Sequence, residues 1–121
     1  MHRDMDIIRQ IVLAVRDAPG AISRIDGIDD KTYLVHAQLV VEAELVEGRV
    51  MRSGITPGVP GAVMLMRLTW VGHDFADSIV DDTLWKKAKD NVLKPSASWT
   101  FGILVEYLKA EIKRRIPGLD Q

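Results

Sequence analysis

The chain has 121 residues, of which 47% are hydrophobic and 27% are charged. That length and balance fit one globular domain with its own core and are not those of a disordered chain. Cysteine is absent, which excludes disulfides, thiolate zinc sites and a cysteine nucleophile. No apolar run approaches the roughly 18 residues of a membrane span, and the N-terminus is too charged for a signal peptide. We therefore expect a cytoplasmic protein that does not associate with membranes.

Charge is distributed unevenly along the chain. Residues 1–80 hold eight Lys or Arg and eleven Asp or Glu, which gives a net charge of −3. Residues 81–121 hold eight Lys or Arg and six Asp or Glu, which gives a net charge of +2. The N-terminal part could bind DNA only if its few cations were gathered on one surface, because neutralising phosphate supplies most non-specific affinity.

Two helices are predicted in the first third of the chain. Apolar residues recur at helical spacing over residues 3–17, until Ala18-Pro19-Gly20 ends the run. Residues 20–28 read as a loop with room for one short strand. A second helix is predicted over residues 30–43, capped by Asp29 or Asp30. Its inward stripe is expected to consist of Leu34, Ala37 and Val41.

The hydrophobic period changes after the second helix. Residues 45–52 and 62–68 are β-prone, and the segment between them is dense in Gly and Pro, so a hairpin is predicted. Thr69 would then cap the next helix, in which Phe75 and Ile79 pack inward.

Two further helical segments are predicted in the C-terminal part. Residues 81–83 are expected to break or bend the chain before an apolar stripe that ends near Pro95. The last helix, over residues 97–116, has a second apolar face that contains Trp99, Ile103 and Tyr107. This second face indicates either a deep core position or the interface of a homodimer. Trp70, Trp85 and Trp99 lie on apolar stripes and are interpreted as core anchors.

The pattern as a whole predicts an α+β protein with a winged helix-turn-helix-like domain and a C-terminal helical extension. Residues 1–80 would form the winged-helix-like core, with the hairpin as its wing. Residues 81–121 would form helices packed on that core within the same single domain.

The segment Arg67-Leu68-Thr69-Trp70-Val71-Gly72-His73-Asp74-Phe75 and its continuation to Trp85, together with residues 1–9, resemble an uncharacterised family of short bacterial and phage proteins known only as a domain of unknown function. The resemblance implies a winged-helix-like core and an association with prophages or other mobile elements, and it supplies no catalytic residues. Two positions depart from the family pattern, which favours an acidic residue at Val71 and a glycine at Glu44. The second departure leaves the end of the second helix uncertain.

A winged-helix fold favours DNA as a partner. The predicted contacts are Thr32 and His36 on the outward face of the second helix and Arg49 and Arg52 on the hairpin. The protein would be a non-catalytic, DNA-associated regulator of phage or mobile-element type. The outward face contains no Arg or Asn, however, so the support comes mainly from the fold analogy.

A protein-interaction module that uses the winged-helix fold is the alternative. Val35 and Leu39 on the second helix would contribute to the contact surface, as would Trp99, Ile103 and Tyr107 on the last helix. The partner would be another protein or a second copy of the chain.

No enzymatic activity, metal or cofactor is predicted. The dipeptide His73-Asp74 is a weak signal for a metal-dependent phosphohydrolase, and it lacks a nearby second histidine. No serine lies in a nucleophile-elbow context, and the Gly/Pro loop lacks the Gly-Lys-Ser/Thr of a phosphate-binding loop.

Overall fold

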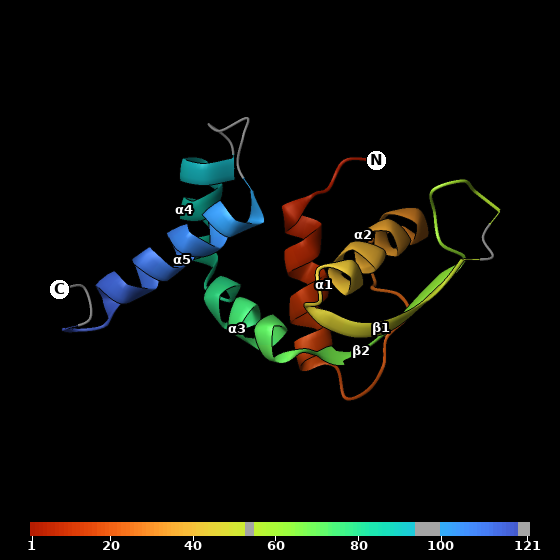
Figure 1. The fold of residues 1–121 in the computed structure, drawn as a ribbon, viewed down its shortest axis with the longest axis horizontal. Coiled ribbons are helices and arrows are strands. Elements are labelled where there is room, and N and C mark those ends of the chain that lie inside the picture. The colour runs from red at the N-terminus through yellow and green to blue at the C-terminus, as the bar shows by residue number, and fades with distance from the viewer. Residues whose placement is uncertain (53–54, 94–99, 119–121) are drawn as a thin grey trace. The chain divides into compact units, whose positions relative to one another are not determined.

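The computed structural model describes residues 1–52, 55–93 and 100–118. Within these residues the protein is a mixed α+β structure with five α-helices, one π-helical segment and two strands. The elements in chain order (Figure 1) are α1 (Met5–Asp17), α2 (Asp30–Glu42), β1 (Val46–Met51), β2 (Ala62–Leu68), α3 (Trp70–Ile79), α4 (Asp82–Ala88), η1 (Lys89–Leu93) and α5 (Phe101–Arg115). The chain divides into two compact units, Met1–Ala76 and Asp77–Gln121.

The hairpin of the first unit is a two-stranded antiparallel sheet. Its register runs from Val46 opposite Leu68 to Met51 opposite Ala62, with a β-bulge at Glu47/Gly48. On the far side of β2, Ile22 forms an isolated antiparallel bridge to Leu65, where the sequence left room for a short strand. The strand β2 therefore lies between β1 and Ile22.

Helix α2 packs against both α1 and the sheet. Its buried residues are Tyr33, His36, Ala37 and Val40. The Tyr33 hydroxyl donates to the Val63 carbonyl at 2.9 Å, which ties α2 to β2. Burial raises the pKa of Tyr33 to about 12, so the phenol remains a neutral donor at physiological pH.

The turn after α2 confirms the predicted end of that helix despite the unusual Glu44. The Leu45 N–H donates to the Val40 carbonyl at 3.1 Å, and the Glu44 N–H donates to the Val41 carbonyl at 3.0 Å. These two bonds form a Schellman motif, which requires a left-handed residue just after the helix. Glu44 adopts that conformation, with φ of 61°.

The same turn receives the start of α3. The Thr69 hydroxyl donates to the Glu44 carbonyl at 2.7 Å and accepts from the Gly72 N–H at 2.9 Å, so the predicted cap is confirmed. A Cβ on Gly72 would overlap the Leu45 carbonyl oxygen. Glycine is therefore required here by the close approach of α3 to the turn.

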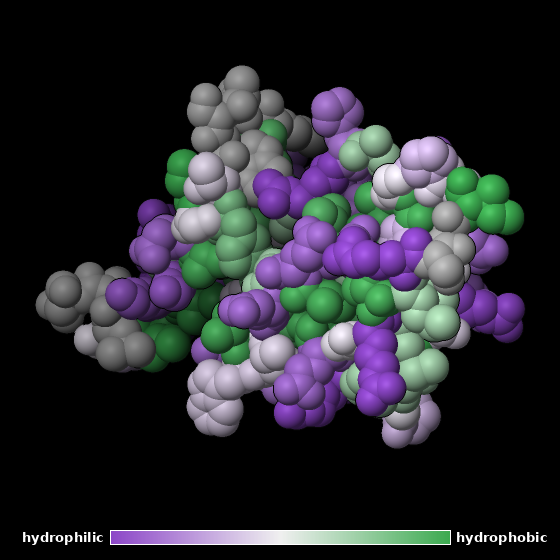
Figure 2. Space-filling model, turned by 45° about the vertical axis from the view of Figure 1, so that its right-hand side comes forward, coloured by the Kyte–Doolittle hydropathy of each residue, from purple (hydrophilic) through white to green (hydrophobic). Residues whose placement is uncertain are grey.

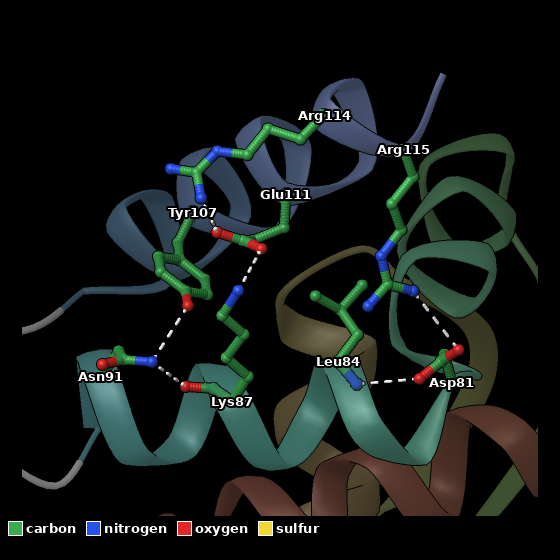
Figure 3. Close-up of polar contacts among 8 residues, drawn as sticks. All are labelled: Asp81, Leu84, Lys87, Asn91, Tyr107, Glu111, Arg114 and Arg115. Atoms are coloured by element: carbon green, nitrogen blue, oxygen red, sulfur yellow. Dashed lines mark hydrogen bonds and ion pairs between the residues drawn. The ribbon is translucent and has the colours of Figure 1, made fainter. Parts of the chain in front are cut away.

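The second unit is built from α4, η1 and α5, and its polar contacts are drawn in Figure 3. Asp81 caps α4 by accepting from the Leu84 N–H at 2.8 Å, and it pairs with Arg115 at 3.4 Å. The buried Glu111 lies between Lys87 at 2.8 Å and Arg114 at 3.0 Å. The bond from Lys87 is the main cause that lowers the pKa of Glu111 below its ordinary value.

Candidate binding surface

His36 does not face outward, so the helix orientation predicted from the sequence is wrong. Only 1% of its surface is exposed. The Asp4 N–H donates to His36 Nε2 at 2.9 Å, and His36 Nδ1 lies 2.8 Å from the Thr32 carbonyl. These partners assign the proton to Nδ1 and make His36 a structural tie between the start of α1 and α2.

The other predicted DNA contacts lie on different parts of the first unit. Thr32 is half-buried in the first turn of α2, where its N–H donates to the Asp29 carboxylate at 3.1 Å. Arg49 is exposed in the middle of β1, whereas Arg52 lies just after the strand and lines a small hollow with Gln38. The structure therefore does not gather the four predicted residues on one surface.

The predicted protein-interface residues belong to both units. Val35 and Leu39 are half-buried on α2. On α5, Ile103 is 50% exposed, whereas Tyr107 is half-buried and its hydroxyl accepts from Asn91 Nδ2 at 3.2 Å (Figure 3). Trp99 lies outside the described residues.

A different surface gathers exposed apolar side chains. Trp70 is 85% exposed, its neighbour in sequence Val71 is 58% exposed, and Met66 in β2 is 44% exposed. The core role predicted for Trp70 is therefore wrong. Trp70 and Val71 lie between Thr69 and Gly72, the two residues that contact the α2–β1 turn. Figure 2, which brings the hairpin side of the first unit forward, shows hydrophobic residues exposed among hydrophilic ones.

These side chains border an open groove of about 1020 Å³, which we call the Trp70 groove. It is lined by the end of α2, the first four residues of β1, the end of β2 and the start of α3. Its charged residues include Glu47 and Arg67, which pair across the sheet at 2.9 Å, and Arg49. The alternation of exposed Met64 and Met66 with buried Val63 and Leu65 could have indicated this outer face from the sequence.

Neither a metal cluster nor a membrane-spanning helix is present in the described part of the chain. No three His, Cys, Asp or Glu residues within it are arranged to hold a metal ion. His73 and Asp74 are both exposed. No described helix is long and apolar enough to cross a bilayer.

Comparison with known proteins places the chain in a family. The family model described as "Hypothetical protein (DUF2513)" matches residues 2–98. The chain belongs to the DUF2513 family. A curated relative from Haemophilus influenzae, named "Uncharacterized protein", is 30% identical over 101 residues, which are 79% of this chain and 82% of the relative. No solved structure matches.

The DUF2513 match confirms the uncharacterised family that the sequence resembled. It includes both blocks of the resemblance, residues 1–9 and 67–85, apart from the first residue. The hydrogen bonds of Thr69 and the close approach at Gly72 give a physical reason for the central part of that pattern.

Proposed function

We propose that the protein is a non-catalytic module that binds another protein chain through the Trp70 groove. The observation that carries this proposal is the 85% exposure of Trp70 at the border of the groove. Covering one tryptophan removes roughly 150–250 Å² from water, and tryptophan and methionine are enriched in the buried centres of protein interfaces.

Charge also favours a protein partner over DNA. Residues 1–76 carry eight Lys or Arg and ten Asp or Glu, so this unit has a net charge of −2. The lining of the groove mixes both signs, because Glu44 and Glu47 lie beside Arg49 and Arg67. A mixed rim around apolar residues is typical of protein interfaces, whereas DNA-binding surfaces are strongly positive.

A serine in place of Trp70 tests this function. Because Trp70 is exposed, Trp70→Ser should leave the melting temperature within about 2 °C of the parent while reducing recovery of captured partner by about tenfold. Ile103→Ser on α5 is the control, since it removes an exposed apolar side chain outside the groove. The measurement is quantitative affinity capture from the organism that encodes the chain, with all three proteins as bait. Equal capture by the parent and Trp70→Ser would contradict the proposal.

DNA association, as in a winged-helix regulator of a phage or mobile element, is a second candidate. It is favoured by the hollow that Gln38 of α2 and Arg52 share beside the hairpin loop, because Gln and Arg are common readers of base edges. Arg52→Glu should then weaken binding to all duplexes alike and reduce the salt dependence by about one phosphate contact. Fluorescence anisotropy with labelled duplexes at low and physiological salt checks this. Absence of binding by the parent at low salt would remove the candidate.

A further inference from the structure

The strand β1 has an outer edge that faces away from β2. Among residues 1–52, 55–93 and 100–118, the sheet consists of β1 and β2 alone, with Ile22 bridged to β2 on the opposite side. Along this outer edge, residues 46–49 line the Trp70 groove. An unpaired strand edge is a template for pairing with another strand.

The hydrogen bonds of β2 show which groups of β1 point outward. The N–H and carbonyl of Leu65 both bond to Ile22, and the Val63 carbonyl accepts from Tyr33, so these two residues face away from β1. Their partners across the ladder are Gly48 and Val50. In an antiparallel ladder, the two residues of a non-hydrogen-bonded pair both direct their N–H and carbonyl groups away from each other. When the backbone groups of a β2 residue point away from β1, those of its β1 partner therefore point away from β2. Gly48 and Val50 therefore present backbone donors and acceptors at the outer edge of β1.

The sequence of β1 is complementary to itself in an antiparallel register centred on Gly48. In that register Gly48 lies opposite Gly48 of a second copy, and Val46 lies opposite Val50. Gly48 and Val50 present their backbone groups at this edge, and the alternation of backbone direction along a strand places those of Val46 on the same side. Each of these pairs can therefore exchange two hydrogen bonds. Glu47 then lies opposite Arg49 in both halves of the pairing, on the exposed face of the sheet.

The charged pairs fall at the favourable positions of this register. Glu47 and Arg49 form the non-hydrogen-bonded pairs, in which opposing side chains approach most closely. The Glu47 carboxylate already pairs with Arg67 of its own hairpin at 2.9 Å. In the paired state it would lie between Arg67 of one copy and Arg49 of the other.

We infer that the protein forms a homodimer in which two β1 strands pair antiparallel about Gly48 and make one four-stranded sheet. This inference rests on the proposed function, since it names a second copy of this chain as the partner that enters the Trp70 groove. Main-chain bonds would supply affinity, and the reciprocal Glu47–Arg49 pairs would set the register.

Charge variants provide a direct test by sedimentation velocity over a range of concentrations. Arg49→Glu places two like-charged pairs across the two-fold axis, and Glu47→Arg does the same with the opposite sign. Each variant alone should raise the dimer dissociation constant by about tenfold or more. Mixed in equal amounts, the two variants should form a heterodimer, because every pair across the interface is then complementary. Arg24→Glu, which makes the same charge change in the exposed segment between α1 and α2, is the control and should dimerise like the parent.

Hydrogen exchange locates the interface independently. The Gly48 and Val50 amides should become protected as the protein concentration rises, while the amides of α5 should not change. A parent that is monomeric at every concentration overturns the inference. The outer edge of β1 would then be available to pair with an extended segment of another protein. A dimer unaffected by both variants, or one that protects α5 instead, also overturns it.

The two proposals fail in distinguishable ways. A monomeric parent whose protein capture is still lost in Trp70→Ser overturns the β1 pairing and keeps the proposed function. A dimer that responds to the charge variants as described supports the β1 pairing, whatever Trp70→Ser does to capture of other proteins.

Discussion

At the third position of α3, Gly72 leaves room for the carbonyl of Leu45. Its N–H is bonded to the Thr69 hydroxyl, and that hydroxyl in turn reaches the Glu44 carbonyl. One residue without a side chain thus allows the start of α3 to rest on the turn that begins β1. The segment that carries the family resemblance is explained by this contact, because a larger residue would separate the helix from the turn.

Alanine in place of Gly72 should destabilise the protein by about 3 kcal/mol, since its Cβ would collide with rigid backbone. Urea unfolding followed by circular dichroism measures the change. Gly20→Ala is the control, because nothing lies within 4 Å of a Cβ at that position, and it should shift stability by less than about 0.5 kcal/mol. Similar stabilities for the two variants would show that the backbone at Gly72 and Leu45 can shift to accommodate a Cβ without loss of stability.

Two residues show where sequence reasoning fails at this scale. The sequence places His36 on the outward face because the inward stripe of Leu34, Ala37 and Val41 orients the helix, yet of these only Ala37 is fully buried. Helix α2 packs against both α1 and the sheet, so a wider part of its surface is buried. That buried surface includes the His36 imidazole, both of whose nitrogens have hydrogen-bond partners. The sequence predicts a core position for Trp70 because it lies on an apolar stripe, but the orientation of a first helical residue depends on how the helix is docked. Hydrophobic periodicity therefore predicts neither the burial of His36 nor the exposure of Trp70.

At the scale of elements, α5 is tied to α4 by charged groups as well as by packing. The Glu111 carboxylate lies between one cation from each of these helices, Lys87 and Arg114. Its pKa is lowered in the folded state, so the ionised form is favoured by folding. The resulting stabilisation is complete above the ordinary value of 4.5 and is lost as the pH falls through the lower folded value.

Acidification should therefore destabilise the parent more than Glu111→Gln. We expect the thermal stability of the parent to fall between about pH 5 and pH 3, and the slope to be shallower in the variant, which has no carboxylate to protonate. Glu106→Gln is the control, because Glu106 is exposed and only 3.7 Å from Lys109. Melting curves across this pH range decide the question, and parallel slopes for Glu111→Gln and the parent would refute the role of Glu111.

Most elements were predictable because local signals specify them. The Ala18-Pro19-Gly20 stop after α1 and the Gly/Pro loop of the hairpin gave boundaries that agree with the structure to within about two residues. Long-range pairing was not predictable. The β-bulge at Glu47/Gly48 and the bridge from Ile22 to Leu65 depend on contacts between segments far apart in the chain.

At the scale of the whole molecule, the sequence indicated two parts of different charge, and the structure has two compact units. The boundary between the two units falls inside α3, which periodicity treats as one continuous element. The candidate surface was only partly predicted. Arg49 was identified as a surface cation, but its place beside Trp70 and Met66 follows from the docking of α3 and the register of the hairpin.

The left-handed conformation of Glu44 has an evolutionary consequence. A glutamate at φ of 61° lowers the free energy of unfolding relative to a glycine at the same position, because glycine adopts this region without steric conflict. A single nucleotide change converts a glutamate codon to a glycine codon, so this gain is always one mutation away. A lineage that acquires it can tolerate destabilising changes elsewhere, including those that reshape the Trp70 groove for a new partner.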